Sequence, residues 1–310
     1  MKNEAFCFQD NKLIKLDLAI NELKDDEVLI QNQAIGINPV DYKMLDIFDN
    51  SHNGQIMGVD GAGIAIKSNS PLIKLGSNYA YHTDLTKDGS FAKYTIVKAN
   101  ALIPMPQNLD FTLAAALPCA ALTAMQSIAK VPSCVAKKVL VYGAGSFVGK
   151  IICSILAKKG AFVSAVASIK NHGDLYKYGV VKCYDYANCN NFGDDYFAIF
   201  DTTANAKELV KLLKYNGHIV AILGRVEENP TKRFTKCPSL HEIALGAIHQ
   251  HGNEDDFKEL VNFGKYIFKK ALNNELLLPK IIQYDFNDLA LAVNDLSKGI
   301  NGKKAVVVIK

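Results

Sequence analysis

The sequence of 310 residues contains no CxxC pair, although it has seven cysteines. Because that number is odd and the cysteines are widely spaced, we do not expect a disulfide framework. The amino end is polar within three residues and lacks a continuous apolar segment of signal-peptide length. These absences favour a reduced chain that stays in the cytoplasm.

The sequence also lacks a basic stripe, an internal repeat and any low-complexity segment. Lys and Arg are dispersed among Asp and Glu, and the net charge is only +4. Nucleic acid is therefore not expected as a partner. The length exceeds what one hydrophobic core usually serves, so two domains are predicted.

One apolar stretch, residues 111–131, approaches the roughly 20 residues that a membrane-spanning helix needs. It is interrupted near its middle by Pro118 and carries the polar residues Thr123, Gln126 and Ser127. A buried turn followed by a helix is favoured, and a membrane span is the weaker alternative. No membrane association is predicted.

The pattern of apolar residues changes along the chain. Residues 1 to about 110 read as short alternating strands, which indicates a β-rich unit. From about 138 to 250, apolar strands alternate with helices, one of them expected over 206–217, and this pattern predicts a parallel sheet. The tail reads as helix, strand, helix and strand.

A glycine-containing turn follows the apolar run 138–142, which suits a strand buried on both faces. Apolar residues then recur at helical spacing, so a helix is predicted to begin at about Ser146. Glycines in such a turn let main-chain amides approach a diphosphate at the positive end of the helix dipole. A tight turn without a ligand is the alternative. The candidate phosphate-binding residues are Gly143, Ala144, Gly145, Ser146, Phe147, Val148 and Gly149.

The end of the following strand indicates which dinucleotide binds. NAD sites place an acidic residue roughly 20 residues after the turn, where it accepts hydrogen bonds from the ribose 2′-hydroxyl. Here that stretch contains Ser168 and Lys170, with no acid before Asp174. A hydroxyl and an ammonium group suit a 2′-phosphate, so NADPH is the predicted cofactor. Alternatively, Lys170 is only a solvated loop lysine.

Five segments occur in an order that resembles a known family: GINPVDYK, MGVDGAG, DGSFAKYTIVKA, LAAALPCAALTA and FDTTANA. They resemble the medium-chain dehydrogenase/reductase superfamily, and within it the zinc-independent quinone oxidoreductase branch that includes zeta-crystallin. The resemblance implies an α/β fold, with a Rossmann doubly wound parallel sheet and a β-rich GroES-like domain. The expected GroES-like substrate domain comprises 1–122 and 266–310, and the expected Rossmann domain comprises 123–265.

The resemblance also bears on metals. Zinc alcohol dehydrogenases of this superfamily carry a Cys where this chain has Asn38 and a His where it has Val59. Only Cys119 falls at a third ligand position, and the four cysteines of a structural zinc lobe are missing. A catalytic zinc needs three protein ligands, so no metal is expected. Ser146 and Phe147 replace glycines that are usual in this branch.

The activity implied by the resemblance is hydride transfer from NADPH to a small molecule, a quinone or an α,β-unsaturated carbonyl compound. On the substrate side it implies Asn38, Asp41 and Tyr42. On the nicotinamide side it implies Thr123, Thr202, Thr203 and Gly224. Tyr186 is expected to pack by the adenosine, beside Ser168 and Lys170. A homodimer is expected through the sheet edge within 223–248.

Several alternatives stay open at this point. Asp41 is as readily explained as the N-cap of a helix as by a substrate role. His82 is a candidate proton donor, although a surface-loop histidine without a role is the commoner case. His249 and His251 are expected at a helix end or loop edge. As a whole, the chain could instead be a non-catalytic NADPH-binding protein with a sensing or RNA-associated role or, less readily, an alcohol dehydrogenase.

Overall fold

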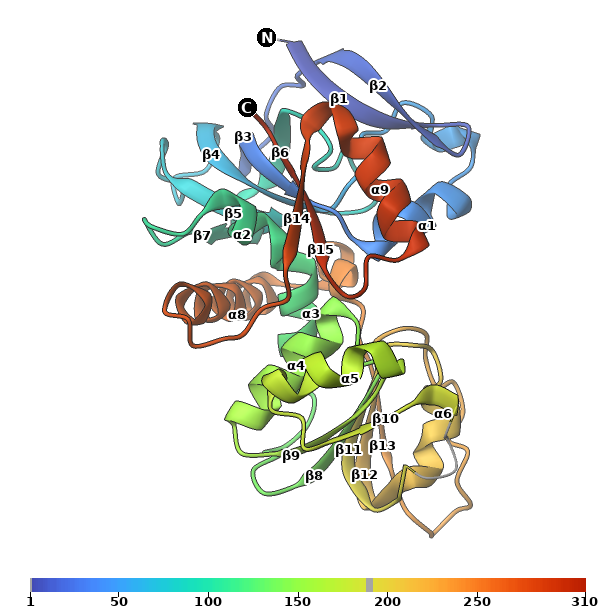
Figure 1. Ribbon diagram of the computed structural model, residues 1–310. Coiled ribbons are helices and arrows are strands. Elements are labelled where there is room, and N and C mark those ends of the chain that lie inside the picture. Colours follow the sequence, from blue (N-terminus) through green and yellow to red (C-terminus); the bar gives the residue numbers. More distant parts are fainter. Residues whose placement is uncertain (1, 188–191) are drawn as a thin grey trace. The chain divides into compact units, whose positions relative to one another are not determined.

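A computed structural model describes residues 2–187 and 192–310 of the chain, which forms two compact units (Figure 1). Unit 1 comprises Met1–Leu122, Gly246–Asn273 and Lys280–Lys310, and unit 2 comprises Thr123–Leu245 and Asn274–Pro279. These units differ from the predicted domain ranges chiefly at residues 246–265. Helix α8 (Glu254–Leu272) begins in that stretch and packs against β7 of unit 1. The domain boundaries inferred from the sequence stay a prediction.

Unit 1 is built on a seven-stranded sheet in the order β14, β15, β3, β4, β5, β7, with β6 beside β3. Neighbouring strands are antiparallel, except that β14 and β15 are parallel. The strands are β3 (Glu27–Gly36), β4 (Asp60–Ser68), β5 (Asn78–His82), β6 (Tyr94–Lys98), β7 (Leu102–Pro104), β14 (Ile281–Asp285) and β15 (Lys304–Val308). The first and last thirds of the chain thus share one sheet, in which β15 pairs with β3.

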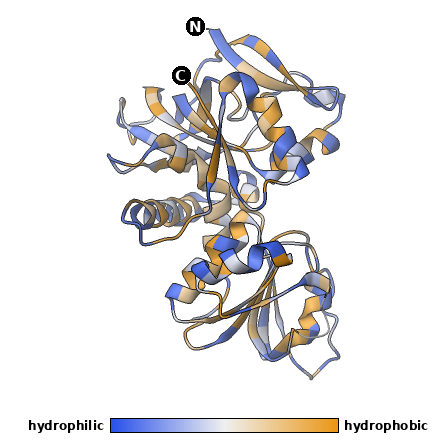
Figure 2. Ribbon diagram, in the orientation of Figure 1, coloured by the Kyte–Doolittle hydropathy of each residue, from blue (hydrophilic) through white to orange (hydrophobic). Residues whose placement is uncertain are grey.

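A two-stranded ribbon, β1 (Lys2–Gln9) and β2 (Lys12–Ala19), completes the strands of unit 1. The inner residues of β1, including Phe6 and Phe8, are buried in an apolar core with Phe91 and Val307. Figure 2 shows that the strands of this unit carry both hydrophobic and hydrophilic residues. The helices are α1 (Pro39–Ile47), α2 (Phe111–Ala116), α7 (Ile248–His251), α8 and α9 (Leu289–Lys298).

Unit 2 contains a six-stranded sheet in the order β10, β9, β8, β11, β12, β13, and every neighbouring pair is parallel. Numbered within the unit, this order is 3-2-1-4-5-6, the order of doubly wound dinucleotide-binding sheets. The strands are β8 (Lys138–Tyr142), β9 (Phe162–Val166), β10 (Lys182–Tyr184), β11 (Tyr196–Asp201), β12 (Leu213–Ala221) and β13 (Ser239–Glu242). The predicted fold class, a Rossmann sheet with a β-rich companion, is confirmed.

The helices of unit 2 are α4 (Phe147–Lys158), α5 (His172–Leu175) and α6 (Ala206–Leu209), while α3 (Pro118–Ala129) begins in unit 1 and ends in unit 2. The prediction of a helix over 206–217 is wrong for the second half of this range. After α6 and a single 3₁₀ turn, the chain enters β12 at Leu213. Leu213 is fully buried in the core of this unit, so tertiary packing overrides the local helical preference.

The apolar stretch 111–131 forms two helices, α2 and α3, with a break at Leu117. None of the helices in the described residues is both long and apolar enough to span a bilayer. The six cysteines in the described residues are free thiols, and Cys189 lies outside these residues.

Candidate functional site

The glycine turn of unit 2 joins the end of β8 to the start of α4, as predicted. Ser146 is the N-cap of α4, and its hydroxyl accepts a hydrogen bond from the Gly149 amide at 3.0 Å. Gly143 has a φ of +83°, and a Cβ there would lie 2.0 Å from Thr202 Oγ1. A Cβ at Gly149 would lie 2.7 Å from the Ala144 Cα. Only glycine therefore fits at the first and last of the three glycine positions.

Several amides of this turn donate to carbonyl oxygens within the protein. The amides of Gly143 and Ala144 both donate to the Val166 carbonyl at 3.0 Å. The Ser146 amide donates to the Gly143 carbonyl at 3.1 Å. These bonds fix the turn against the end of β9, so the amides of Gly143, Ala144 and Ser146 are already used within the protein.

Two threonines from the end of β11 lie beside the turn. Thr202 Oγ1 donates to the Gly143 carbonyl at 3.1 Å, and it lies 3.4 Å from Ser146 Oγ. The Thr203 hydroxyl and amide both donate to Asp201 Oδ1, at 2.7 and 2.9 Å. Strands β8 and β11 flank the point where the strand order reverses, which is where open α/β sheets bind ligands.

The remaining predicted cofactor residues of unit 2 lie on different elements. Gly224, with a φ of +73°, follows the end of β12. Thr123 lies in α3, where its carbonyl accepts a hydrogen bond from Ser127. Tyr186 makes an edge-to-face contact with Tyr142 of β8, with ring centroids 5.4 Å apart. Tyr186 is thereby held close to the turn.

At the end of β9, Ser168 is half-buried and Lys170 is exposed. The sequence has no acid between Ser168 and Asp174, but the fold places one beside this stretch. Asp185, at the end of the neighbouring strand β10, accepts a hydrogen bond from the Ile169 amide at 2.9 Å. The expectation of a carboxylate-free corner is therefore wrong. Reading the sequence along β9 alone could not reveal a residue that the next strand contributes.

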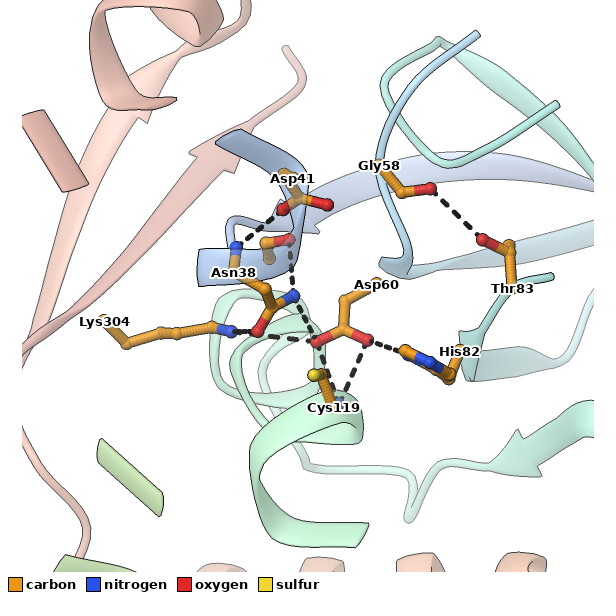
Figure 3. A network of polar contacts seen from close by, with 9 residues as sticks. Asn38, Asp41, Gly58, Asp60, His82, Thr83, Cys119 and Lys304 are labelled. Carbon is orange, nitrogen blue, oxygen red and sulfur yellow. Dashed lines mark hydrogen bonds and ion pairs between the residues drawn. The ribbon is translucent and has the colours of Figure 1, made fainter. Parts of the chain in front are cut away.

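Unit 1 contains a second candidate site, a buried polar network around Asp60 (Figure 3). Asp60 is fully buried at the start of β4. Its carboxylate accepts hydrogen bonds from Asn38 Nδ2 at 2.9 Å and from the Cys119 amide at 3.0 Å. His82 Nδ1 lies 2.9 Å from Asp60 Oδ1, and Lys304 Nζ lies 3.7 Å from Asp60 Oδ2.

Two members of this network were not foreseen as site residues from the sequence. Asp60 occurs in the quoted segment MGVDGAG but was given no role, and Lys304 stands on the last strand. The Lys304 ammonium donates to Asn38 Oδ1, and the Asn38 side chain also donates to Asp60. The Asn38 side chain is thus held by hydrogen bonds to Lys304 and Asp60. Pairing of β15 with β3 brings Lys304 here, across a separation of 266 residues.

Asp41 lies on the first turn of α1, not at its N-cap. The N-cap is Asn38, whose amide donates to Asp41 Oδ2 at 2.6 Å. The predicted alternative, Asp41 as N-cap, is therefore wrong by three positions. Asp41 Oδ1 is buried without a hydrogen-bond partner among the described residues. Tyr42, the next residue, packs against the apolar core of unit 1.

His82 is buried at the end of β5, so the alternative of a surface-loop histidine is wrong. It is only 5% exposed, and its ring centroid lies 5.9 Å from that of His249. Burial, and then the neighbouring His82, lower the pKa of His249 to about 4. His249 lies on the short helix α7, as expected for a helix end, but its Nε2 is buried and has no partner among the described residues.

Comparison with known proteins gives this geometry a context. Residues 24–107 match the alcohol dehydrogenase GroES-like domain. The chain is 30% identical over 229 residues to a 2-methylene-furan-3-one reductase of Solanum lycopersicum. It is 29% identical over 229 residues to an NADPH-dependent alkenal/one oxidoreductase of Arabidopsis thaliana, and 26% identical over 278 residues to a quinone oxidoreductase of Sus scrofa. These matches support the resemblance to the medium-chain dehydrogenase/reductase superfamily.

The extent of these matches differs. The alignments to the two plant proteins cover 69% of this chain but only 59% of each relative, and the alignment to the Sus scrofa protein covers 83% and 82%. Among solved structures, the quinone oxidoreductase of Coxiella burnetii has a TM-score of 0.83 at 20% identity, covering 100% of this chain and 99% of that one. A thermostable alcohol dehydrogenase of Pyrobaculum aerophilum has a TM-score of 0.83 at 18% identity, covering 99% and 100%. These structures support the medium-chain dehydrogenase/reductase fold.

The network in unit 1 includes three side chains of types that can bind metal ions. Ligand atoms of Asp60, His82 and Cys119 lie within 4.8 Å of one another. Two features oppose a metal ion here. Lys304 already places a positive charge beside Asp60, and burial raises the pKa of the Cys119 thiol, whereas metals bind the thiolate. The absence of a metal stays a prediction. These two features support it without relying on the replacement of zinc ligands by Asn38 and Val59.

The protonation of Asp41 should be visible in the stability of the protein. Burial raises the pKa of Asp41 to about 8, so the folded chain holds a proton that the unfolded chain releases near pH ~4. Asp41 therefore makes the free energy of unfolding fall as pH rises from ~4 to ~8, by up to about 1.4 kcal/mol per pH unit. In the Asp41→Asn variant this slope should be lost, because an amide does not titrate in this pH range. The amide oxygen can still accept the hydrogen bond from the Asn38 amide, so the start of α1 is kept.

Urea denaturation followed by circular dichroism at several pH values between 5 and 8 measures this slope. Asp46→Asn, an exposed carboxylate on the same helix, is the matched control and should keep the slope of the wild type. Equal slopes for the wild type and Asp41→Asn would show that Asp41 is ionised in the folded protein.

Proposed function

We propose that this chain is an NADPH-dependent oxidoreductase that transfers a hydride to a small quinone or α,β-unsaturated carbonyl compound. The observation that carries the proposal is the glycine turn at the reversal point of the 3-2-1-4-5-6 sheet, next to the start of α4. The printed names of the relatives support the substrate class, since they include an alkenal/one oxidoreductase and a quinone oxidoreductase.

The turn fits the diphosphate of such a coenzyme. Added Cβ atoms at Gly143 and Gly149 would collide with their neighbours, so the turn is built for close backbone packing. We assign diphosphate binding to residues 145–149, where the positive end of the α4 dipole lies. Ser168, Lys170 and Tyr186 would hold the adenosine 2′-phosphate end. Thr123, Thr202, Thr203 and Gly224 would line the nicotinamide end.

When bound, NADPH supplies the hydride, and a proton must also reach the reduced product. We assign this second requirement to the network of unit 1. Asp60 orients the His82 ring through the contact at 2.9 Å, and His82 is the group proposed to supply the proton. Asn38 and Asp41 keep the start of α1 in place through the hydrogen bond at 2.6 Å. Tyr42 is proposed to bound the substrate space.

The setting proposed for this activity is a cytoplasmic homodimer. Strand β13 pairs with β12 on one side, and no other strand of the described residues pairs with it. Its free edge is a surface through which two copies can extend their sheets. The free thiols of the six described cysteines agree with a reducing compartment.

A coenzyme-binding and turnover experiment tests the proposed function. Purified protein should change the fluorescence of NADPH on binding and should oxidise NADPH when a small enone, alkenal or quinone is added. The panel should include simple alcohols with NADP⁺ as a control for alcohol dehydrogenase activity. Binding of NADPH without turnover of any panel member would point instead to a non-catalytic role, and absence of binding would refute the proposal.

A further inference from the structure

The corner formed by the ends of β9 and β10 contains a carboxylate, that of Asp185, which has no role in the proposed function. β10 runs parallel to β9, with Tyr184 opposite Val166. Asp185 follows directly, and its two oxygens accept hydrogen bonds from the amides of Ile169 and Ala187, each at 2.9 Å. The Asp185 carboxylate is thus held against the backbone segment that joins Ser168 to Lys170.

A second contact fixes this corner. His172 Nε2 lies 2.9 Å from the Ala167 carbonyl and 3.2 Å from the Tyr184 carbonyl. One ring nitrogen therefore bridges the last residue before Ser168 and the last residue before Asp185. Because both strand ends are tied together, the position of the Asp185 carboxylate relative to Ser168 is set by the fold.

The two charged side chains at this corner have opposite effects on the two coenzymes. Lys170 is exposed and forms no ion pair within residues 2–187 and 192–310, so its ammonium group is available to a 2′-phosphate. Asp185 is a carboxylate that would repel a 2′-phosphate and accept a hydrogen bond from a ribose 2′-hydroxyl. Its backbone bonds use one acceptor position on each oxygen and leave further lone pairs.

We propose that Asp185 sets the coenzyme preference of this protein: it opposes Lys170, so that the site binds NADH as well as NADPH. The acid that NAD-binding sheets place at the end of their second strand is supplied here by the third. This inference rests on the proposed function, because it assumes that unit 2 binds a nicotinamide dinucleotide. It also explains how a corner with Ser168 and Lys170 can keep a ribose-binding acid.

Two variants of Asp185 separate its charge from its structural role. Asp185→Asn removes the charge but keeps an oxygen that can accept from the Ile169 amide. Asp185→Ala removes both. Asp195→Asn is the matched control. It removes the same charge directly before the amino end of β11, whereas Asp185 follows the carboxyl end of β10, and the φ of +68° at Asp195 suits asparagine.

Dissociation constants for NADPH and NADH, measured by fluorescence titration at low salt, give the result. In Asp185→Asn we expect the preference for NADPH over NADH to rise about three- to tenfold, as for the loss of a partly screened charge beside the 2′-phosphate. The rise should shrink at high salt. Lys170→Met should lower the preference by a similar factor, and Asp195→Asn should leave it unchanged.

The outcomes distinguish this inference from the proposed function. If the wild type binds both coenzymes and Asp185→Asn changes their ratio less than twofold, Asp185 has no selective role, whatever the enzyme reduces. If the ratio shifts as expected but no quinone or enone is reduced, the inference stands and the proposed activity fails. If neither coenzyme binds to the wild type, both are refuted.

Discussion

Replacing Gly143 by alanine is expected to weaken NADPH binding about 100-fold, which corresponds to roughly 3 kcal/mol. The residue has a φ of +83°, a conformation that alanine adopts only at a cost. Its methyl group would also lie 2.0 Å from Thr202 Oγ1 and 2.6 Å from Thr203 Cγ2. Since both contacts are made with the two residues that directly follow β11, the turn must move away from the reversal point of the sheet.

Gly173→Ala is the matched control for this variant. Gly173 lies in α5 of the same unit, and a Cβ there would meet nothing within 4 Å. Fluorescence titration with NADPH measures the affinity, and circular dichroism establishes that both variants are folded. Unchanged affinity in a folded Gly143→Ala protein would show that the coenzyme does not use this turn.

Replacing Lys304 by methionine should lower the free energy of unfolding by about 3 kcal/mol. Lys304 is 3% exposed, and its ammonium lies 3.7 Å from Asp60 Oδ2 in the network of Figure 3. Without it, the side-chain oxygen Oδ1 of Asn38 loses its hydrogen-bond donor, and the buried Asp60 carboxylate loses the positive charge of Lys304. Removing one partner of a buried pair costs more than removing both, because the other is left uncompensated.

A double-mutant cycle tests this interpretation. The variant Lys304→Met with Asp60→Asn should be more stable than the sum of the single effects predicts, by more than about 1 kcal/mol. Lys303→Met, which alters the exposed neighbouring lysine, should stay near the wild type. The account of the network is contradicted if Lys304→Met costs less than about 1 kcal/mol or if the two changes are additive.

The parts of the fold that depend on local sequence were predictable. The turn from β8 to α4, with Ser146 as N-cap, follows from glycine spacing and from helical periodicity within a dozen residues. The prediction of a helix over 206–217 is wrong in its second half because burial of Leu213 in the sheet outweighs the local helix propensity. Tertiary packing is not visible in a short window of sequence.

The parts of the candidate sites that depend on pairing between distant strands were not predictable. Lys304 reaches Asn38 because β15 pairs with β3, and Asp185 reaches Ile169 because β10 pairs with β9. His82 was recognised as a candidate, but its burial depends on the pairing of β5 with β4. Individual residues carry no signal of such neighbours in one sequence.

The most direct test of the proposed activity is to follow the hydride itself. NADPH deuterated at the transferred position of the nicotinamide should be incubated with the protein and a small enone, and the reduced product analysed by mass spectrometry. We predict one deuterium at the β-carbon of the product. When unlabelled NADPH is used in deuterated water, that carbon should carry no deuterium. A reduced product without deuterium from the coenzyme, or no reduced product from any enone or quinone, would contradict it.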